Sequence, residues 1–191
     1  MSDLLPILIR TVLITNIILT MYIGLCPFFG VSKKLGPAIS MGIAVIFVMS
    51  LASLVTWIIN TYVLIPFDVE FMRIVIYILV IATAVQMVEM FIKRTTATLY
   101  NALGIYLPLI TTNCAVLAVT FINTNEGYNL LQSMVCAFGT GLGFALVLVL
   151  MSSIREKLEL ADLPESMKGL PIAFLVAMLL ALAFFGFGGM A

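Results

Sequence analysis

The sequence has little charge: only 9% of its 191 residues are charged, and it contains no histidine. A soluble domain of this length normally carries charge on about a quarter of its residues, whereas 63% of this chain is hydrophobic. The scarcity of charge therefore excludes an ordinary soluble domain and predicts an integral membrane protein. The nine basic and nine acidic residues balance, which argues against a nucleic-acid partner.

Cysteine is also scarce, and Cys26, Cys114 and Cys136 all lie within apolar segments. This placement argues against an extracellular disulfide framework. A cleavable signal peptide is not expected, because the first apolar stretch is too long and lacks both a basic leader and a small-residue cleavage site. We expect that stretch to be the first membrane span.

Long apolar segments take up most of the chain. A helix needs about 20 apolar residues to cross the hydrocarbon layer, and six segments qualify. The predicted spans are approximately residues 6–29, 37–59, 71–92, 99–122, 129–152 and 170–189. The connections are too short for a soluble catalytic domain, so we expect an all-α polytopic membrane protein with a single membrane domain over residues 1–191.

Basic residues are concentrated in the connections that lead from odd-numbered to even-numbered spans. Lys and Arg near span ends are retained on the cytoplasmic side, and the opposite side has only Arg10 and Arg73. We therefore expect both termini outside. The basic residues in the predicted cytoplasmic connections are Lys33, Lys34, Lys93, Arg94, Arg155, Lys157 and Lys168.

The longest predicted connection, residues 154–169, mixes acidic and basic residues. A charged run of this kind is usually a solvated cap. The alternative is a docking surface for a cytoplasmic subunit.

Residues that disturb helices flank two of the cysteines. Gly24 and Pro27 surround Cys26, and Pro108 precedes Cys114. Proline is disfavoured inside a helix, and glycine adopts backbone conformations closed to other residues. The polar residues between Pro108 and Cys114 can hydrogen-bond backbone groups that a break leaves free; they are Thr111, Thr112 and Asn113.

The chain shows a weak internal similarity. Residues 16–32 align with residues 104–120, and this alignment places Cys26 over Cys114. Three spans in each half mean that the second half enters the membrane from the opposite side. The sequence therefore predicts two inverted three-helix repeats, approximately residues 1–94 and 95–191, with functional sites near the midplane on interrupted helices.

Helix geometry sets a condition for a site shared by the two cysteines. If the first and fourth spans were straight, Cys26 and Cys114 would differ in depth by about 15 Å. Two thiolates on one iron centre must approach within roughly 4 Å, so both helices must be broken near the midplane for the thiols to meet. An iron–sulfur cluster normally takes four thiolates, so another chain would supply two. The alternative is that the pair only packs, which we expect of Cys136.

Three runs carry a resemblance to a known family. They are GLCPFFGVSKKL at residues 24–35, LGIYLPLITTNCAV at 103–116 and IREK at 154–157. With these motifs the chain resembles the RnfA/NqrE family over essentially its whole length. The Cys-Pro-Phe continuation after Leu25 is more similar to RnfA of the Rnf ferredoxin:NAD oxidoreductase complex than to NqrE of the sodium-pumping quinone reductase.

The resemblance implies a six-span subunit of the prokaryotic cytoplasmic (inner) membrane. Such a subunit pairs with a homologous RnfE-type subunit of opposite orientation, and a [2Fe-2S] cluster lies between them. Each of the two contributes two cysteines, which match Cys26 and Cys114 here. The resemblance also implies flavins and further iron–sulfur clusters on other Rnf subunits of the B, C, D and G types, and electron transfer between ferredoxin and NAD coupled to Na⁺ or H⁺ movement.

An ionisable side chain within a span is a candidate functional group. Glu89 lies one helical turn before Lys93, so it is either a station on an ion path or an interfacial partner of Lys93 or Arg94. Further possible ion ligands are Asn113, Thr111 and Thr112 and, more weakly, Asn16 and Thr15.

Within the resembled family, the alternative is an NqrE-type subunit of the Na⁺-translocating NADH:quinone reductase. Two functions outside the family also fit the same residues. A small secondary transporter also uses inverted repeats and broken helices; it would transport a substrate without partners and contain no iron. A structural assembly subunit would use its cysteines only for packing.

Overall fold

The computed structural model describes residues 4–14, 16–67, 70–95, 109–110, 112–160, 164 and 168–186. Every regular element within these ranges is a helix. The predicted all-α class is therefore confirmed for the described part of the chain. Of the fourth predicted span, residues 99–122, the structure describes only residues 109–110 and 112–122.

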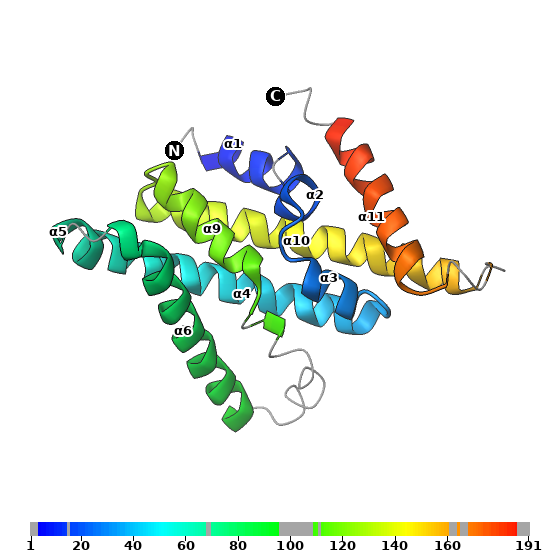
Figure 1. The fold of residues 1–191 in the computed structure, drawn as a ribbon, viewed down its shortest axis with the longest axis horizontal. Coiled ribbons are helices and arrows are strands. Elements are labelled where there is room, and N and C mark those ends of the chain that lie inside the picture. Colours follow the sequence, from blue (N-terminus) through cyan, green and yellow to red (C-terminus); the bar gives the residue numbers. More distant parts are fainter. Residues whose placement is uncertain are drawn as a thin grey trace.

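Two long helices, α4 (Leu35–Ile59) and α10 (Leu130–Glu159), run side by side through the centre of the molecule (Figure 1). Small residues allow their close approach. A Cβ atom added at Gly42 would lie 2.9 Å from Ala145 Cβ, and one added at Gly141 would lie 2.9 Å from Ile46 Cα. Small residues at helix contacts are the usual means of close packing in membranes, where hydrophobic burial between helices drives little association.

The first apolar segment is divided into several short helical pieces. Asn16 has an extended backbone, and Tyr22 and Gly24 both have left-handed backbones. Asn16 starts the second α-helical piece, because its Oδ1 accepts a hydrogen bond from the amide of Ile18 at 3.3 Å. The pieces are α1 (Leu4–Ile9), the π-helix η1 (Arg10–Ile14), α2 (Ile17–Met21) and α3 (Leu25–Val31).

The remaining elements surround the α4–α10 pair (Figure 1). The helix α9 contacts α4, α10 and α6, whereas α11 contacts α2 and α10. These elements are the π-helix η2 (Asn60–Leu64), α5 (Ile65–Phe67), the 3-10 helix η3 (Glu70–Met72), α6 (Arg73–Thr95), α9 (Cys114–Asn125) and α11 (Leu170–Phe185).

Three described helical stretches are long and apolar enough to cross a membrane: Leu35–Leu64, Arg73–Met90 and Leu130–Glu159. They correspond to the second, third and fifth predicted spans. The helices α9 and α11 are apolar but shorter.

The helix that carries the fifth predicted span is longer than that span. Helix α10 continues to Glu159, so the first part of the expected 154–169 connection is helical. Glu156, Lys157 and Glu159 are not buried there, but Arg155 is. The expected solvent exposure of the charged residues is therefore wrong for Arg155.

Large apolar side chains remain exposed on two outer helices. On α6 they include Ile78 and Leu79, and on α11 they include Phe174 and Leu182. A water-soluble monomer rarely exposes contiguous apolar surface of this extent. These faces suit contact with lipid or with other membrane helices.

Candidate functional site

Cys26 lies in the first turn of α3, directly after a sharp change of chain direction. Gly24 precedes that turn with φ 88°, a left-handed conformation that favours glycine. Pro27 follows Cys26, and proline is tolerated in a first helical turn because its missing amide would have no partner there. The Cys26 thiol is exposed.

Cys114 is the first residue of α9. The preceding residue, Asn113, has an extended backbone, and its Oδ1 accepts a hydrogen bond from the amide of Ala115 at 3.1 Å. This is a typical asparagine N-cap, which satisfies one of the amides left free at a helix start. The Cys114 thiol is also exposed.

The two cysteine segments contact each other, although Cys26 and Cys114 lie far apart in the sequence. A Cβ atom placed on Gly24 would lie 3.1 Å from Ala115 Cβ and 3.2 Å from both Asn113 Oδ1 and Phe144 Cε2. The Gly24 backbone thus lies directly against the start of α9. This contact brings the first turns of α3 and α9 together with both thiols accessible.

Cys114 lies at the N-terminal end of α9. The first amide groups of α9 lack intrahelical partners, and the helix macrodipole places partial positive charge at this end. A thiolate is the form in which cysteine binds iron or zinc.

Arg155 anchors the other end of α3. Its Nη1 donates hydrogen bonds to the Phe29 carbonyl at 3.2 Å and to Ser32 Oγ at 2.7 Å. A guanidinium at a helix C-terminus interacts favourably with the free carbonyls and with the macrodipole. Arg155 therefore fixes α3, and with it Cys26, to α10.

The burial of Arg155 has a signal in the sequence, although its charge suggests a solvated connection. Phe144, Leu148, Met151 and Arg155 follow helical spacing and are all buried. Extending the apolar stripe of α10 by one turn reaches Arg155.

The other predicted candidates lie in different surroundings. Cys136 is buried in α10, as its packing interpretation expects. Glu89 is half-buried on α6, whereas the Lys93 side chain lies outside the described residues. Asn16 is buried and donates to the Gly143 carbonyl at 3.0 Å, which gives it a structural role.

The polar run before Cys114 is only partly described. Thr112 is exposed, and Thr111 lies outside the described residues, as do Pro108 and Thr15. Asn113 is buried, and its Nδ2 has no hydrogen-bond partner among the described residues. A buried amide without a partner is uncommon and indicates an acceptor supplied from elsewhere.

Two thiols from one chain do not complete a metal site. Within the described ranges no three His, Cys, Asp or Glu side chains gather into a metal-binding group. The pair Cys26 and Cys114 therefore offers half of the sulfur ligands of a four-thiolate centre. Its exposure leaves room for ligands from a neighbouring chain.

Comparison with known proteins places the chain among membrane subunits. A family model described as "Rnf-Nqr subunit, membrane protein" matches residues 4–191. Relatives from Azoarcus sp. (strain BH72), Serratia proteamaculans and Shewanella oneidensis are each 52% identical over 190 residues. The alignments cover 100% of this chain and 98%, 98% and 99% of the relatives, and each relative is named as the A component of an ion-translocating oxidoreductase complex.

Proposed function

The chain belongs to the Rnf-Nqr family of membrane-protein subunits, and on that premise we propose that it is the RnfA-type component of a redox-driven, ion-translocating oxidoreductase complex. The names of its full-length relatives support this role. The chain is one part of an enzyme whose flavins and other clusters lie on further subunits of the Rnf B, C, D and G types. This enzyme transfers electrons between ferredoxin and NAD.

Within the complex, Cys26 and Cys114 hold one side of a [2Fe-2S] cluster, and an RnfE-type homologous subunit supplies the other two cysteines. The contact of Gly24 with Asn113 and Ala115 carries this proposal, because it joins the two cysteine turns with both thiols exposed. Thiolates are the ligands that such a cluster requires. When bound, the cluster supplies one-electron transfer within the membrane.

The proposed architecture has six spans in two inverted repeats, with the first and fourth spans broken near the midplane. The chain departs from helix at Tyr22–Gly24, just before Cys26, and at Asn113, just before Cys114. The equivalent positions of these interruptions support the inverted repeat. In this arrangement the cysteine turns come from opposite faces of the bilayer and meet between them.

The surrounding residues position the two thiols. Gly24 permits the approach of the two turns, Asn113 caps α9, and Arg155 fixes α3 to α10. The Nδ2 of Asn113, without a partner among the described residues, is a donor for a sulfur acceptor. Hydrogen bonds to sulfur tune the reduction potential of such centres.

Ion movement, of Na⁺ or H⁺, is coupled to electron transfer through this protein. Glu89, Thr111, Thr112 and Asn113 are the proposed ion-path residues. The protein resides in the prokaryotic inner membrane with both termini outside, and the basic residues of the odd-to-even connections support that orientation.

The test compares purified complexes that carry Cys114→Ser, Cys26→Ser or, as a matched control, the buried Cys136→Ser. We expect the first two variants to assemble and lose the electron paramagnetic resonance signal of one [2Fe-2S] cluster, its iron, ferredoxin-driven NAD⁺ reduction and ion pumping. The Cys136→Ser complex should keep all four. Normal turnover with Cys26→Ser and Cys114→Ser would identify an assembly component, and substrate transport by the isolated, iron-free chain would identify a secondary transporter.

A further inference from the structure

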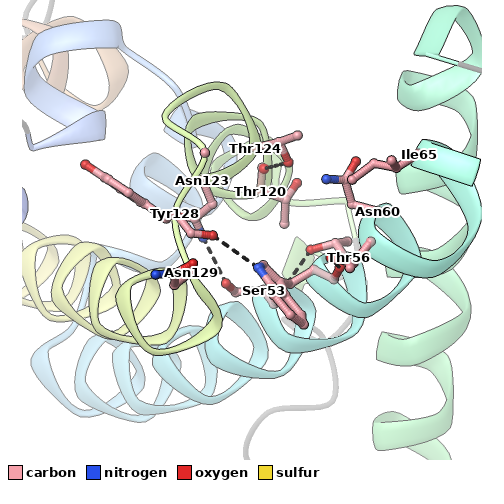
Figure 2. A pocket seen from close by; sticks show the side chains of 12 residues that line it. Ser53, Thr56, Asn60, Ile65, Thr120, Asn123, Thr124, Tyr128 and Asn129 are labelled. Atoms are coloured by element: carbon pink, nitrogen blue, oxygen red, sulfur yellow. Dashed lines mark hydrogen bonds between the residues drawn. The ribbon is translucent and has the colours of Figure 1, made fainter. Parts of the chain in front are cut away.

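A polar cavity of about 230 Å³ lies where the C-terminal part of α4, the end of α9 and the start of α10 meet (Figure 2). It is separate from the cysteine turns. Asn123, in its wall, lies nine residues after Cys114 along α9, which is roughly 14 Å of helix. Polar cavities inside a membrane bundle are costly unless something satisfies their polar groups.

The hydroxyl groups of the cavity wall offer oxygen lone pairs rather than protons. Four of these hydroxyls each donate to a main-chain carbonyl, at distances from 2.7 to 3.1 Å. A hydroxyl has one hydrogen and two lone pairs, so the oxygens of Thr56 and Thr120 remain as acceptors. Ser53 Oγ already accepts one hydrogen bond from Asn123, and Thr124 Oγ1 also bonds to the Tyr77 hydroxyl at 2.9 Å. The residues concerned are Ser53, Thr56, Thr120 and Thr124.

Two carboxamide oxygens add to this set of acceptors. Asn123 is 6% exposed, and its Nδ2 donates to Ser53 Oγ at 2.9 Å and to the Ser133 carbonyl at 3.3 Å. These bonds fix the orientation of the carboxamide, and Asn123 Oδ1 then has no hydrogen-bond partner in the described part of the chain. The buried Oδ1 of Asn60 also lacks a partner there. Both residues line the cavity.

Two donors near the cavity are already used within the protein. Trp57 Nε1 donates to the Tyr128 carbonyl at 3.1 Å, and the Asn129 amide donates to Gln132 Oε1 at 3.1 Å. These bonds leave the lining rich in acceptors. Such a lining suits a ligand that carries positive charge.

The charge of the lining favours a monovalent cation. None of the twelve lining residues, all of them described, is acidic or basic. Burial is the main cause that raises the pKa of Tyr128, and the nearby Glu126 carboxylate is the second. The Tyr128 phenol is therefore neutral at physiological pH. Divalent cations such as Ca²⁺ usually require carboxylate ligands. The end of α9 at Asn125 adds the partial negative charge of a helix C-terminus.

The backbone of the wall is irregular at the same place. Helix α4 changes into the π-helix η2 at Asn60, and short π-helical segments occur frequently at functional sites.

We propose that this cavity binds a monovalent metal cation of the alkali series through neutral oxygens, chiefly Asn60 Oδ1, Asn123 Oδ1 and the hydroxyl of Thr120. This inference rests on the proposed role in ion translocation, and the site is independent of the [2Fe-2S] cluster. It lies at the end of the bundle where α4 and α9 finish and α10 begins.

The experiment measures equilibrium binding of ²²Na⁺ to the purified complex in choline chloride. Thr120→Val removes one hydroxyl at nearly constant volume, and we expect it to weaken one class of Na⁺ site by roughly tenfold. Asn60→Asp adds a negative charge to the same lining, and we expect it to strengthen that class by roughly tenfold. A substitution that merely disturbs the fold would weaken Na⁺ binding in both variants. Opposite changes in Na⁺ affinity therefore indicate that the substituted residues bind the cation.

The matched control is Thr140→Val. Thr140 is a buried threonine on α10 whose hydroxyl donates to the Cys136 carbonyl at 2.8 Å, and it does not line this cavity. We expect its Na⁺ binding to equal that of the unsubstituted complex. Unchanged Na⁺ affinity in both Thr120→Val and Asn60→Asp would overturn the proposal and leave a water-filled cavity.

If the complex with Thr120→Val does not assemble, the Na⁺ affinity of the Asn60→Asp complex alone tests the proposal. The absence of tighter Na⁺ binding in Asn60→Asp would then refute the site. The result is also distinguishable from failure of the cluster assignment. The Cys114→Ser complex should lose the signal of the shared [2Fe-2S] cluster and keep this class of Na⁺ site.

Discussion

Gly24 combines a left-handed backbone with a close contact, since an added Cβ atom would lie 3.1–3.2 Å from side-chain atoms of three neighbours. We predict that Gly24→Ala lowers the stability of the complex by more than the roughly 1–2 kcal/mol that a left-handed alanine costs by itself, because the added methyl group meets Asn113, Ala115 and Phe144. The same displacement should reduce the iron content. Thermal unfolding of the purified complex and iron analysis measure the two effects.

Two other glycines serve as controls that separate the backbone cost of Gly24→Ala from the cost of its steric contact. Gly127 also has a positive φ, 63°, and a Cβ atom there meets nothing within 4 Å. Gly127→Ala should therefore show only the backbone cost. Gly36 has neither constraint, so Gly36→Ala should be neutral or slightly stabilising. Equal melting temperatures for Gly24→Ala and Gly127→Ala would show that the contact with α9 contributes nothing.

Arg155 is buried, and its hydrogen bonds end on α3 and the residue that follows it. We predict that Arg155→Met lowers stability by about 1.5–3 kcal/mol, since charged hydrogen bonds are lost and buried acceptors remain unpaired. Lys157→Met, at an exposed position two residues away, should change stability by less than about 0.5 kcal/mol. The measurement is the melting temperature of the assembled complex. Similar melting temperatures for both variants would show that Arg155 does not anchor α3.

At the level of helices, the α4–α10 contact depends on the small size of Gly141. An added Cβ atom would lie 2.9 Å from the Cα atom of Ile46, which is backbone and cannot rotate away. We predict that Gly141→Ala destabilises the protein by about 1–3 kcal/mol, the usual cost of overpacking. Gly186→Ala, where nothing lies within 4 Å, is the control. Thermal unfolding of the two variants tests the prediction, which fails if their melting temperatures agree.

Hydropathy predicted the long helices well, because about 20 apolar residues in sequence leave few alternatives in a membrane. The second predicted span, 37–59, differs from α4 by two residues at its start, and the third, 71–92, is displaced by two or three residues from α6. The fifth ends seven residues early, at 152 instead of Glu159. The helix continues beyond the apolar segment because the side chain of Arg155 faces inward and is buried.

The candidate site was predictable in part. Gly24 and the polar run before Cys114 indicated helix interruptions, and the structure departs from helix beside both cysteines. The contact between the two turns was not predictable, since it depends on how α3 and α9 pack against Phe144 in a third helix. The polar cavity was missed for a similar reason: its oxygens come from three segments, and each hydroxyl alone is an ordinary helix residue.

For the molecule as a whole, the exposed apolar surface and the distribution of basic residues give a testable orientation. Lys33 follows α3 and Glu126 follows α9, and both are exposed. The predicted topology places Lys33 in the cytoplasm and Glu126 outside. We therefore expect a membrane-impermeant maleimide to label Glu126→Cys in intact spheroplasts and to label Lys33→Cys only after lysis. Each signal is measured above the labelling of the unsubstituted protein, and the reverse pattern would invert the orientation.

The attachment of α3 to α10 through Arg155 has a mechanical consequence. Cys26 is carried on a short segment tied to α10, whereas Cys114 opens a helix that packs chiefly on α4. A small sliding or rotation of α10 along α4 would therefore move one sulfur relative to the other. The spacing of the two sulfurs therefore depends on the relative position of the two central helices, and a partner that shifts these helices changes that spacing without touching either cysteine.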